Sequence, residues 1–314
     1  MLLKIGTRRS PLAMAQTHHI AGLIKAKHPD AAFELHPIAT MADKDLVSKF
    51  HQFGTIGVFS IEHEQQLASG EVDIVVHSLK DLPTTLREGL VLAAVPERAD
   101  PRDVLCGTAL ARLRSGARVG TGSLRRRSQI LSLRPDVEVV PIRGNVGSRL
   151  GRTAGEDGLD AVILAYAGLE RLGLGAEMAE MLDPELFPYA VGQGALGVQA
   201  RAGDTAILAM LAAIEDPKAR AEVECERALL HALGAGCSLP VGTSATWRDG
   251  RLALFGQITS HDGDRRITAR HEDDGAGTAA LGLATAAALR RDGGIDVLES
   301  SYRDLCAQFR TVSH

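Results

Sequence analysis

Arginine and glycine residues gather between Arg118 and Arg149, with a spacing that suits the binding of an acidic ligand. One turn reads GTGSLRRR and contains Arg125 and Arg126, and a second reads IRGNVGSR and contains Arg143. Arginine presents a planar fork that binds a carboxylate or phosphate through two hydrogen bonds. Glycine allows close approach of the backbone, and the free N–H groups of a helix start favour an anion. The two turns predict a pocket for a ligand that carries several negative groups.

The elements around these turns favour binding over the simpler alternative, a solvated helix face, which is the usual explanation of an arginine run. Each turn follows a short apolar strand and enters a helix, with glycine beside the charges. The arginines do not stand at i, i+4 spacing with acidic partners, as a solvated face would predict.

A similar strand–turn–helix unit occurs near the start of the chain. KIGTRRSPLAMAQ (4–16) and RVGTGSLRRRSQI (118–130) share a basic residue, a β-branched residue, Gly-Thr, and then serine and arginine before a helix. Ser10 is a good N-cap, and Pro11 suits the first helical position. The pattern suggests one βα device used in each of two similar lobes.

A third polar cluster, His77 to Asp81, follows an apolar strand expected at 72–76. In open α/β sheets, ligands bind at the carboxyl ends of strands, so this position favours a functional role. Lys80 and Asp81 could equally form an ordinary surface ion pair, and the sequence leaves both interpretations open.

The amino-acid composition limits the classes of protein to which the chain can belong. The chain has 314 residues, of which 45% are hydrophobic and 24% charged, as in a globular protein of two or three domains. A net charge of −4 and an aromatic share of 4% argue against nucleic-acid binding. No apolar run approaches 18 residues, and charges interrupt the first residues, so neither a membrane span nor a signal peptide is expected. We therefore expect a cytoplasmic protein.

Two motifs do not have the context that their function requires. His63-Glu64 begins like a zinc-protease motif, but position 67 is leucine, so the second metal ligand is missing. Residues 192–197 match G-x-G-x-x-G, yet prolines precede them and Gly203-Asp204 prevents a long helix, so a turn is expected instead of a dinucleotide site. The four cysteines are widely separated, which predicts neither a zinc site nor a redox pair.

The last hundred residues change in character. Asp-Gly pairs at 249–250 and 262–263 separate alternating runs, which predicts a three-stranded antiparallel meander. Two helices are expected to follow, at roughly 277–291 and 295–309. Together these elements predict a separate α+β domain.

Seven fragments in order carry a resemblance to a known family: GTRRSPLA, VHSLKDLP, GTGSLRRR, IRGNVGSRL, AGLERLG, AVGQGALG and GAGCSLPVG. Together they resemble the hydroxymethylbilane synthase family, also called the porphobilinogen deaminase family. The resemblance implies an α/β fold with two lobes like type II periplasmic binding proteins, each with a mixed sheet, and a small C-terminal α+β domain with a three-stranded antiparallel sheet. The implied domains are 1–97 with about 195–213, then 98–194, and finally 217–314.

The resemblance also implies an activity. The family joins four porphobilinogen molecules head to tail onto a covalently bound dipyrromethane, with loss of ammonia, and hydrolysis then releases the linear hydroxymethylbilane. The dipyrromethane is attached through a thioether, and the matching position is Cys237. By the same resemblance, Asp81 and Lys80 are the catalytic residues, Phe59 belongs to a covering flap, and no metal takes part. The implied substrate- and cofactor-binding residues are Arg8, Ser10, Ser78, Lys80, Thr121, Ser123, Arg125, Arg126, Arg143, Gly144, Asn145, Arg149, Arg171 and Gln193.

The implied chemistry agrees with the residues themselves. Each pyrrole carries an acetate and a propionate, so the growing chain is strongly anionic and suits arginine forks. A carboxylate such as Asp81 can hold a pyrrole N–H, stabilise the cation formed when ammonia leaves, and help move protons. We expect a monomer whose partner is the small molecule porphobilinogen, with no nucleic acid and no membrane.

One segment departs from the family pattern. Where the family commonly reads GGKGLFxKE, this chain reads FGTIGVFSIEHE, so Ile56 and Ile61 replace two lysines while Phe59 and Glu62 remain. We expect activity with altered affinity. The alternatives are a catalytically altered paralogue and a two-lobed binding protein for a small carboxylate.

Overall fold

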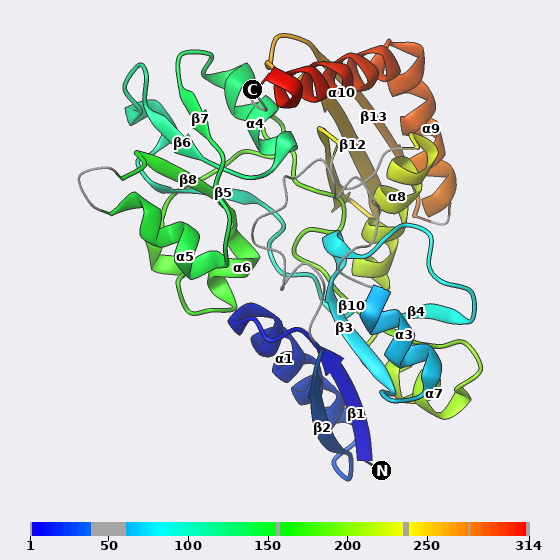
Figure 1. Ribbon diagram of the computed structural model, residues 1–314. Coiled ribbons are helices and arrows are strands. Elements are labelled where there is room, and N and C mark those ends of the chain that lie inside the picture. The colour runs from blue at the N-terminus through cyan, green and yellow to red at the C-terminus, as the bar shows by residue number, and fades with distance from the viewer. Residues whose placement is uncertain (1, 39–60, 155–157, 235–238, 276, 312–314) are drawn as a thin grey trace. The chain divides into compact units, whose positions relative to one another are not determined.

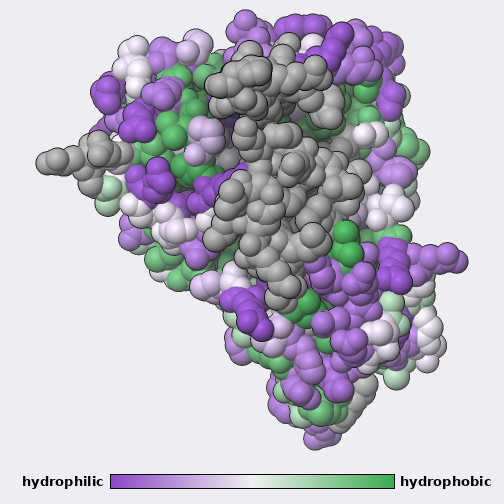
Figure 2. Space-filling view, viewed as in Figure 1, coloured by the Kyte–Doolittle hydropathy of each residue, from purple (hydrophilic) through white to green (hydrophobic). Residues whose placement is uncertain are grey.

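The computed structural model describes residues 2–38, 61–154, 158–234, 239–275 and 277–311 (Figure 1). The chain divides into two compact units. The first unit comprises Met1–Ala99 and Gly192–Ala221, and the second comprises Asp100–Val191 and Glu222–His314. On the face shown in Figure 2, hydrophilic side chains predominate among the coloured residues, with hydrophobic ones scattered between them. No described helix is long and apolar enough to cross a membrane.

The first unit is built on a five-stranded mixed sheet of order β2-β1-β3-β10-β4. β1 pairs in parallel with both β2 and β3, whereas β10 runs antiparallel to β3 and β4. The strands are β1 (Leu2–Thr7), β2 (Ala32–Pro37), β3 (Ile74–Ser78), β4 (Leu90–Ala94) and β10 (Leu196–Arg201). The helices are α1 (Pro11–Lys27), α3 (Ile61–Ser69), the 3₁₀ turn η2 (Leu79–Asp81) and α7 (Thr205–Ala212).

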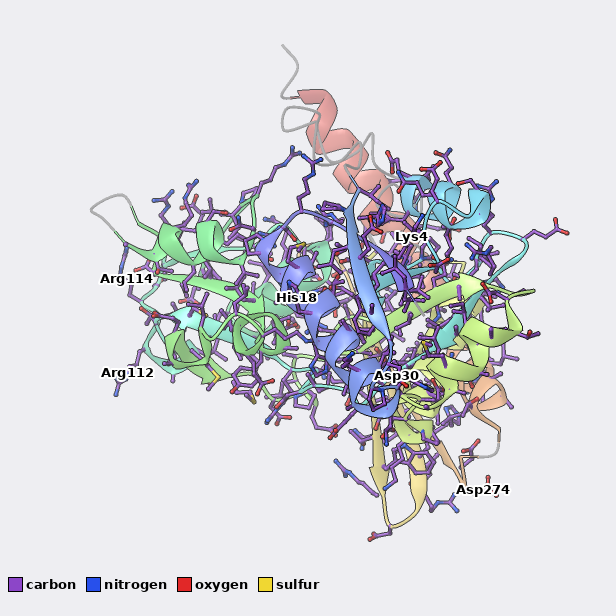
Figure 3. All side chains as sticks on the ribbon, turned by 90° about the horizontal axis from the view of Figure 1, so that it is seen from below. Lys4, His18, Asp30, Arg112, Arg114 and Asp274 are labelled. Atoms are coloured by element: carbon purple, nitrogen blue, oxygen red, sulfur yellow. The ribbon has the colours of Figure 1, made fainter. Side chains whose placement is uncertain are left out.

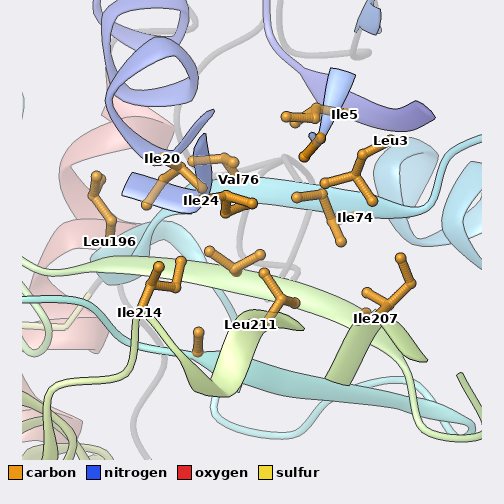
Figure 4. Packing of buried hydrophobic residues seen from close by; sticks show 14 residues of the cluster. Leu3, Ile5, Ile20, Ile24, Ile74, Val76, Leu196, Ile207, Leu211 and Ile214 are labelled. Carbon is orange, nitrogen blue, oxygen red and sulfur yellow. The ribbon is translucent and has the colours of Figure 1, made fainter. Parts of the chain in front are cut away.

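Hydrophobic periodicity explains how the helices cover this sheet. Ile20 and Ile24 of α1 stand one helical turn apart and pack in one cluster with Ile74 of β3 and Leu211 of α7 (Figure 4). Val75, between Ile74 and Val76 in β3, belongs instead to a second cluster with Leu67 of α3. Successive strand residues point to opposite faces, so α1 and α7 lie on one face of the sheet and α3 on the other.

The second unit contains another five-stranded mixed sheet, of order β7-β6-β8-β5-β9. Its strands are β5 (Asp103–Gly107), β6 (Arg118–Gly120), β7 (Glu138–Val140), β8 (Ala161–Ala165) and β9 (Met178–Met181). Its helices are η3 (Leu110–Arg112), α4 (Leu124–Leu133), α5 (Val146–Leu150), η4 (Gly151–Thr153), α6 (Tyr166–Glu170) and η5 (Gly175–Glu177). β6 pairs in parallel with β7 and β8, and β5 runs antiparallel to β8 and β9. The strand order and directions match those of the first sheet, although the inner antiparallel strand comes first in the chain here (β5) and last in the first sheet (β10). A parallel strand followed by a helix, β1–α1 and β6–α4, occupies the same place in both sheets, so the repeated βα device predicted from the sequence is present in both units.

The second unit also holds an antiparallel three-stranded sheet of order β11-β12-β13. Its elements are α8 (Pro217–Ala232), β11 (Val241–Arg248), β12 (Arg251–Thr259), β13 (Arg266–Asp273), α9 (Thr278–Arg291) and α10 (Gly294–Thr311). Asp249 and Gly250 both have positive φ, 49° and 77°, as a two-residue hairpin turn requires. A methyl group at Gly282 of α9 would lie 2.4 Å from the Cys225 carbonyl oxygen of α8, so glycine permits this close helix packing.

The predicted fold class is confirmed: two mixed α/β sheets and a C-terminal α+β part with a three-stranded antiparallel sheet. The strand expected at 72–76 is shifted, because β3 spans Ile74–Ser78. Asp73 precedes it and accepts a hydrogen bond from the backbone N–H of Lys4 at 2.9 Å. The division into three domains remains a prediction, since the second unit contains both the second mixed sheet and the three-stranded sheet.

Candidate functional site

In the first unit, two of the predicted polar segments follow neighbouring parallel strands. Arg8 and Ser10 come directly after β1, and Ser78 ends β3, which pairs with β1 in parallel. Their carboxyl ends therefore lie at the same edge of the sheet. The Nε2 atom of Gln16, in α1, lies 2.8 Å from the Ser78 hydroxyl oxygen, which ties the two segments together. Ser10 caps α1 by accepting a hydrogen bond from the N–H of Ala13 at 3.2 Å.

The AVGQGALG segment forms a tight turn before β10 that packs on η2. Gly192 and Gly194 have φ of 70° and 84°, which only glycine adopts readily. A methyl group at Gly192 would lie 3.2 Å from the backbone N of Lys80. Nζ of Lys80 in turn donates to Oε1 of Gln193 at 3.4 Å. The segment is therefore a turn, as the sequence context predicted, and its glycines allow close packing before β10.

Asp81 ends η2 and its side chain is exposed, whereas Lys80 is half-buried beside Gln193. An exposed carboxylate can hold an N–H group and exchange protons with a ligand. The structure thus brings Arg8, Ser10, Ser78, Lys80, Asp81 and Gln193 together in one unit, at one edge of one sheet.

In the second unit, the basic turns follow the adjacent parallel strands β7, β6 and β8. Arg143 is exposed in the turn after β7, where Gly144 has φ of 109° and Asn145 caps α5 by accepting from the N–H of Ser148 at 2.9 Å. Arg149, in α5, and Arg171, after α6, are half-buried. Burial lowers the pKa of Arg171, and the nearby carboxylate of Glu170 works in the opposite direction.

The turn after β6 is ordered by its own side chains. The Thr121 hydroxyl oxygen accepts a hydrogen bond from the N–H of Ser123 at 3.1 Å. Ser123 caps α4, and its hydroxyl oxygen accepts from the N–H of Arg126 at 3.4 Å. Both residues lie where the sequence placed them, at the junction of strand and helix.

Arg125 and Arg126 point into the protein, toward a carboxylate of the chain itself. Both are buried, and they contact the two oxygens of Asp103, each through Nη2 at 2.7 Å. Desolvation lowers the pKa of Arg125, the negative charge of Asp103 raises it, and the positive charge of Arg126 lowers it further. The expectation that these two arginines bind ligand acids remains a prediction. The structure adds an internal acidic partner that the sequence analysis did not identify.

Asp103 is the first residue of β5 and is fully buried. A sequence signal for it existed, because aspartate is almost never fully buried unless it is paired, and here it opens the apolar run VLC. Gln16 and Gln129 were also missed, and both are buried polar side chains on helices that cover a sheet. Phe59, Ile56 and Cys237 lie outside the described residues.

Fold and site define an α/β protein with two similar mixed sheets, whose basic turns at strand ends suit an acidic ligand. Two family models match the chain: "Porphobilinogen deaminase, dipyromethane cofactor binding domain" over residues 3–209, and "Porphobilinogen deaminase, C-terminal domain" over residues 220–291. The chain belongs to the porphobilinogen deaminase family.

Curated relatives agree over nearly the whole length. A porphobilinogen deaminase of Roseiflexus castenholzii is 45% identical over 295 residues, which cover 93% of this chain and 97% of the relative. That of Brevibacillus brevis is 43% identical over 305 residues, covering 96% and 98%. Among solved structures, the methionine-binding protein MetQ matches 68% of this chain and 89% of its own at 12% identity. Its TM-score of 0.41 is too low to add to what the sheet topology shows.

Family membership confirms the activity implied by the sequence motifs. The chain is a transferase, a hydroxymethylbilane synthase, and its substrate is porphobilinogen. Its cofactor is the dipyrromethane for which the first matching domain is described. The comparisons do not favour an altered paralogue or a carboxylate-binding protein.

The described residues fit this cofactor by their chemistry. A dipyrromethane carries carboxylates on both rings and N–H groups that need an acceptor. Arginine forks and a lysine suit the carboxylates, and an exposed aspartate suits the N–H groups. The residues concerned are Arg8, Lys80, Asp81, Arg143, Arg149 and Arg171.

Proposed function

We propose that the basic residues at the strand ends of both units bind the acetate and propionate groups of porphobilinogen and of the dipyrromethane. The proposal also gives Asp81 the catalytic role, with Lys80 beside it, and attaches the cofactor to Cys237 through a thioether. The observation that carries it is the placement of Asp81. Its exposed carboxylate follows a buried strand and stands next to Lys80, whose ammonium group contacts Gln193 at 3.4 Å.

When bound, the dipyrromethane supplies the pyrrole carbon onto which the first porphobilinogen is joined. The chain's residues supply binding and proton transfer. The carboxylate of Asp81 accepts pyrrole N–H groups, stabilises the positive charge that develops as ammonia leaves, and takes part in moving the displaced ring proton. The ammonium group of Lys80 binds a substrate carboxylate and keeps the pKa of ligand acids low. Arginine forks in the second unit hold the acids of the growing chain.

The remaining assigned residues have supporting roles in this proposal. Ser10, Ser78, Thr121, Ser123 and Asn145 offer hydroxyl or amide groups at the same strand ends, and Gly144 allows the backbone to approach the ligand. Arg8 and Gln193 are the remaining proposed ligand-binding residues of the first unit. Arg125 and Arg126 are those of the second unit. We further propose a monomeric, cytoplasmic enzyme of three domains that binds no nucleic acid.

The departure in the flap segment is proposed to change affinity and leave activity in place. Ile61 is the first residue of α3 and is 49% exposed, so a lysine could occupy this position without repacking the core. Loss of the positive charge weakens attraction for an anionic chain. Measurement of KM for porphobilinogen in Ile61→Lys tests this, and an unchanged KM would count against it.

The activity is tested by incubating the purified chain with porphobilinogen and measuring substrate consumed, ammonia released and bilane formed. We expect one ammonia per porphobilinogen and one bilane per four porphobilinogens. Consumption of substrate without release of a linear tetrapyrrole would contradict the proposed reaction.

A further inference from the structure

A buried polar cluster at the start of α4 connects the arginine turn to the strand that follows the predicted cofactor-attachment position. The carboxylate of Asp103 accepts hydrogen bonds from Nη2 of Arg125 at 2.7 Å and from Nη2 and Nε of Arg126 at 2.7 and 3.1 Å. All three side chains are buried, with Asp103 fully so. The shared carboxylate fixes the direction of both guanidinium groups.

The two arginines then diverge. Arg126 donates through Nη1 to the carbonyl oxygen of Ile163, in β8, at 3.0 Å. Arg125 donates through Nη1 to the carbonyl oxygen of Pro188 at 2.7 Å and to Oε1 of Gln129 at 2.8 Å. Nε2 of Gln129 donates to the same Pro188 carbonyl at 3.0 Å. One backbone carbonyl is therefore held by two buried donors.

The segment held in this way packs directly on β11. The carbonyl oxygen of Tyr189 accepts from the N–H of Thr243 at 2.8 Å. The Tyr189 hydroxyl accepts from the N–H of Ala245 at 3.0 Å and lies 3.2 Å from its carbonyl oxygen. A methyl group at Gly242 would lie 2.6 Å from Nε2 of Gln129 and 2.8 Å from the Pro188 carbonyl oxygen, so glycine allows the strand to approach both groups closely.

We propose that Asp103, Arg125 and Gln129 form a positioning clamp. Through the Pro188 carbonyl they hold β11 against α4, within the second unit. β11 begins at Val241, four positions after Cys237 in the sequence, so the clamp holds the strand that follows the predicted attachment position. None of the three residues needs to touch a ligand for this role. The functional part of this inference depends on the proposed attachment at Cys237, whereas the structural part does not.

Amide hydrogen exchange in the purified holoenzyme measures the clamp directly. In Arg125→Lys, the amides of Thr243 and Ala245 are expected to exchange roughly tenfold faster, because a buried charged hydrogen bond to the Pro188 carbonyl is lost. In Gln129→Met, which changes no assigned ligand-binding residue, a smaller acceleration at the same two amides is expected. Amides of β13 should be unaffected in both variants.

Arg126→Lys is the matched control. It removes a guanidinium from the same carboxylate, at similar burial, but from an arginine that binds the Ile163 carbonyl rather than that of Pro188. It should leave exchange at Thr243 close to that of the unmodified chain. Equal acceleration in Arg126→Lys, or no acceleration in Gln129→Met, would overturn the clamp. If Arg125→Lys fails to fold, Gln129→Met carries the test alone.

The functional part has its own measurement. Intact mass should show a smaller fraction of chains carrying the dipyrromethane in Gln129→Met than in the unmodified chain, or kcat should fall with KM little changed. Full loading and an unchanged kcat despite faster exchange would overturn a role in positioning. An unmodified chain without the dipyrromethane would instead refute the attachment proposal and leave the exchange result standing.

Discussion

Nζ of Lys80 donates a hydrogen bond to Oε1 of Gln193, at 3.4 Å and across 113 positions of the chain. The contact joins the end of β3 to the turn before β10, two segments that the sequence motifs placed in the same site. Gln193 is itself held, because its carbonyl oxygen accepts from Nε of Arg98 at 3.0 Å. The ammonium group of Lys80 is thereby directed by the buried Gln193, and Asp81 follows Lys80 on an exposed turn.

Asp81→Asn is expected to lower kcat by about 10²- to 10⁴-fold, the usual contribution of a positioned acid–base group. The side chain is exposed, so the free energy of unfolding should change by less than about 0.5 kcal/mol. Steady-state kinetics and denaturant unfolding check the two parts. Asp30→Asn is the control, since Asp30 is an exposed aspartate between α1 and β2, at the opposite edge of the same sheet (Figure 3). Similar losses of kcat in both variants would contradict a catalytic role.

Arg143→Gln is expected to raise KM for porphobilinogen about tenfold or more, because a charged hydrogen bond to a carboxylate contributes roughly 1.5–3 kcal/mol. Added salt should raise KM of the unmodified chain more than that of the variant. Arg112→Gln provides the comparison, since Arg112 is exposed and follows β5, whose carboxyl end lies at the opposite edge of the sheet (Figure 3). An equal rise in KM for Arg112→Gln would show that general charge, not the turn after β7, attracts the substrate.

Asp103→Asn should destabilise the protein strongly. Removing one partner from a buried ion pair leaves an uncompensated charge and costs about 3–5 kcal/mol, and here two arginines lose their carboxylate. Asp136→Asn tests the specificity of this effect, because Asp136 pairs with Arg134 at the surface and its loss should matter little. Denaturant titration measures the free energy of unfolding of both variants. A comparable decrease in Asp136→Asn and Asp103→Asn would contradict a special role of the buried carboxylate.

His77 makes stability depend on pH. Its pKa is lowered from 6.5 to about 3, first by burial and then by the positive charge of His63, while the hydrogen bond with Gln199 acts in the opposite direction. Because the folded pKa lies below the ordinary value of 6.5, the unfolded chain binds the proton more tightly. The stability from neutral His77 is therefore complete above pH 6.5 and is lost as pH falls toward 3.

Between pH 7.5 and pH 5, the free energy of unfolding should fall by about 1–2 kcal/mol more in the unmodified chain than in His77→Gln. Denaturant unfolding at the two pH values measures this difference. Parallel pH profiles for both proteins would show that another group is responsible.

Most of the architecture could be predicted from local patterns. Neighbouring residues specify the cap at Ser10, the Asp-Gly turn at 249–250 and the alternating runs of the C-terminal sheet. The structure has all three where the sequence predicted them. The shared sheet order of the two units likewise follows from a repeat visible at 4–16 and 118–130.

The partners of buried polar groups could not be predicted in this way. Asp103 and Arg125 are 22 positions apart, and Arg125 and Pro188 are 63 apart, so only the fold brings them together. The family resemblance assigned both arginines of α4 to the ligand, which stays a prediction, and nothing in the neighbouring residues indicated their shared carboxylate. Arg143 is exposed and Arg125 is buried, a difference that depends on the whole fold and cannot be read from neighbouring residues.

The central claim is that a thiol of this chain carries a dipyrromethane on which the acidic product grows. Intact mass spectrometry of the purified protein tests it most directly. We predict a chain heavier than its sequence by two pyrrole units, which gains further pyrrole units with limiting porphobilinogen, and a Cys237→Ser variant with the bare sequence mass. A purified chain of bare mass that still forms bilane, or a Cys237→Ser chain that keeps the added mass, would contradict it.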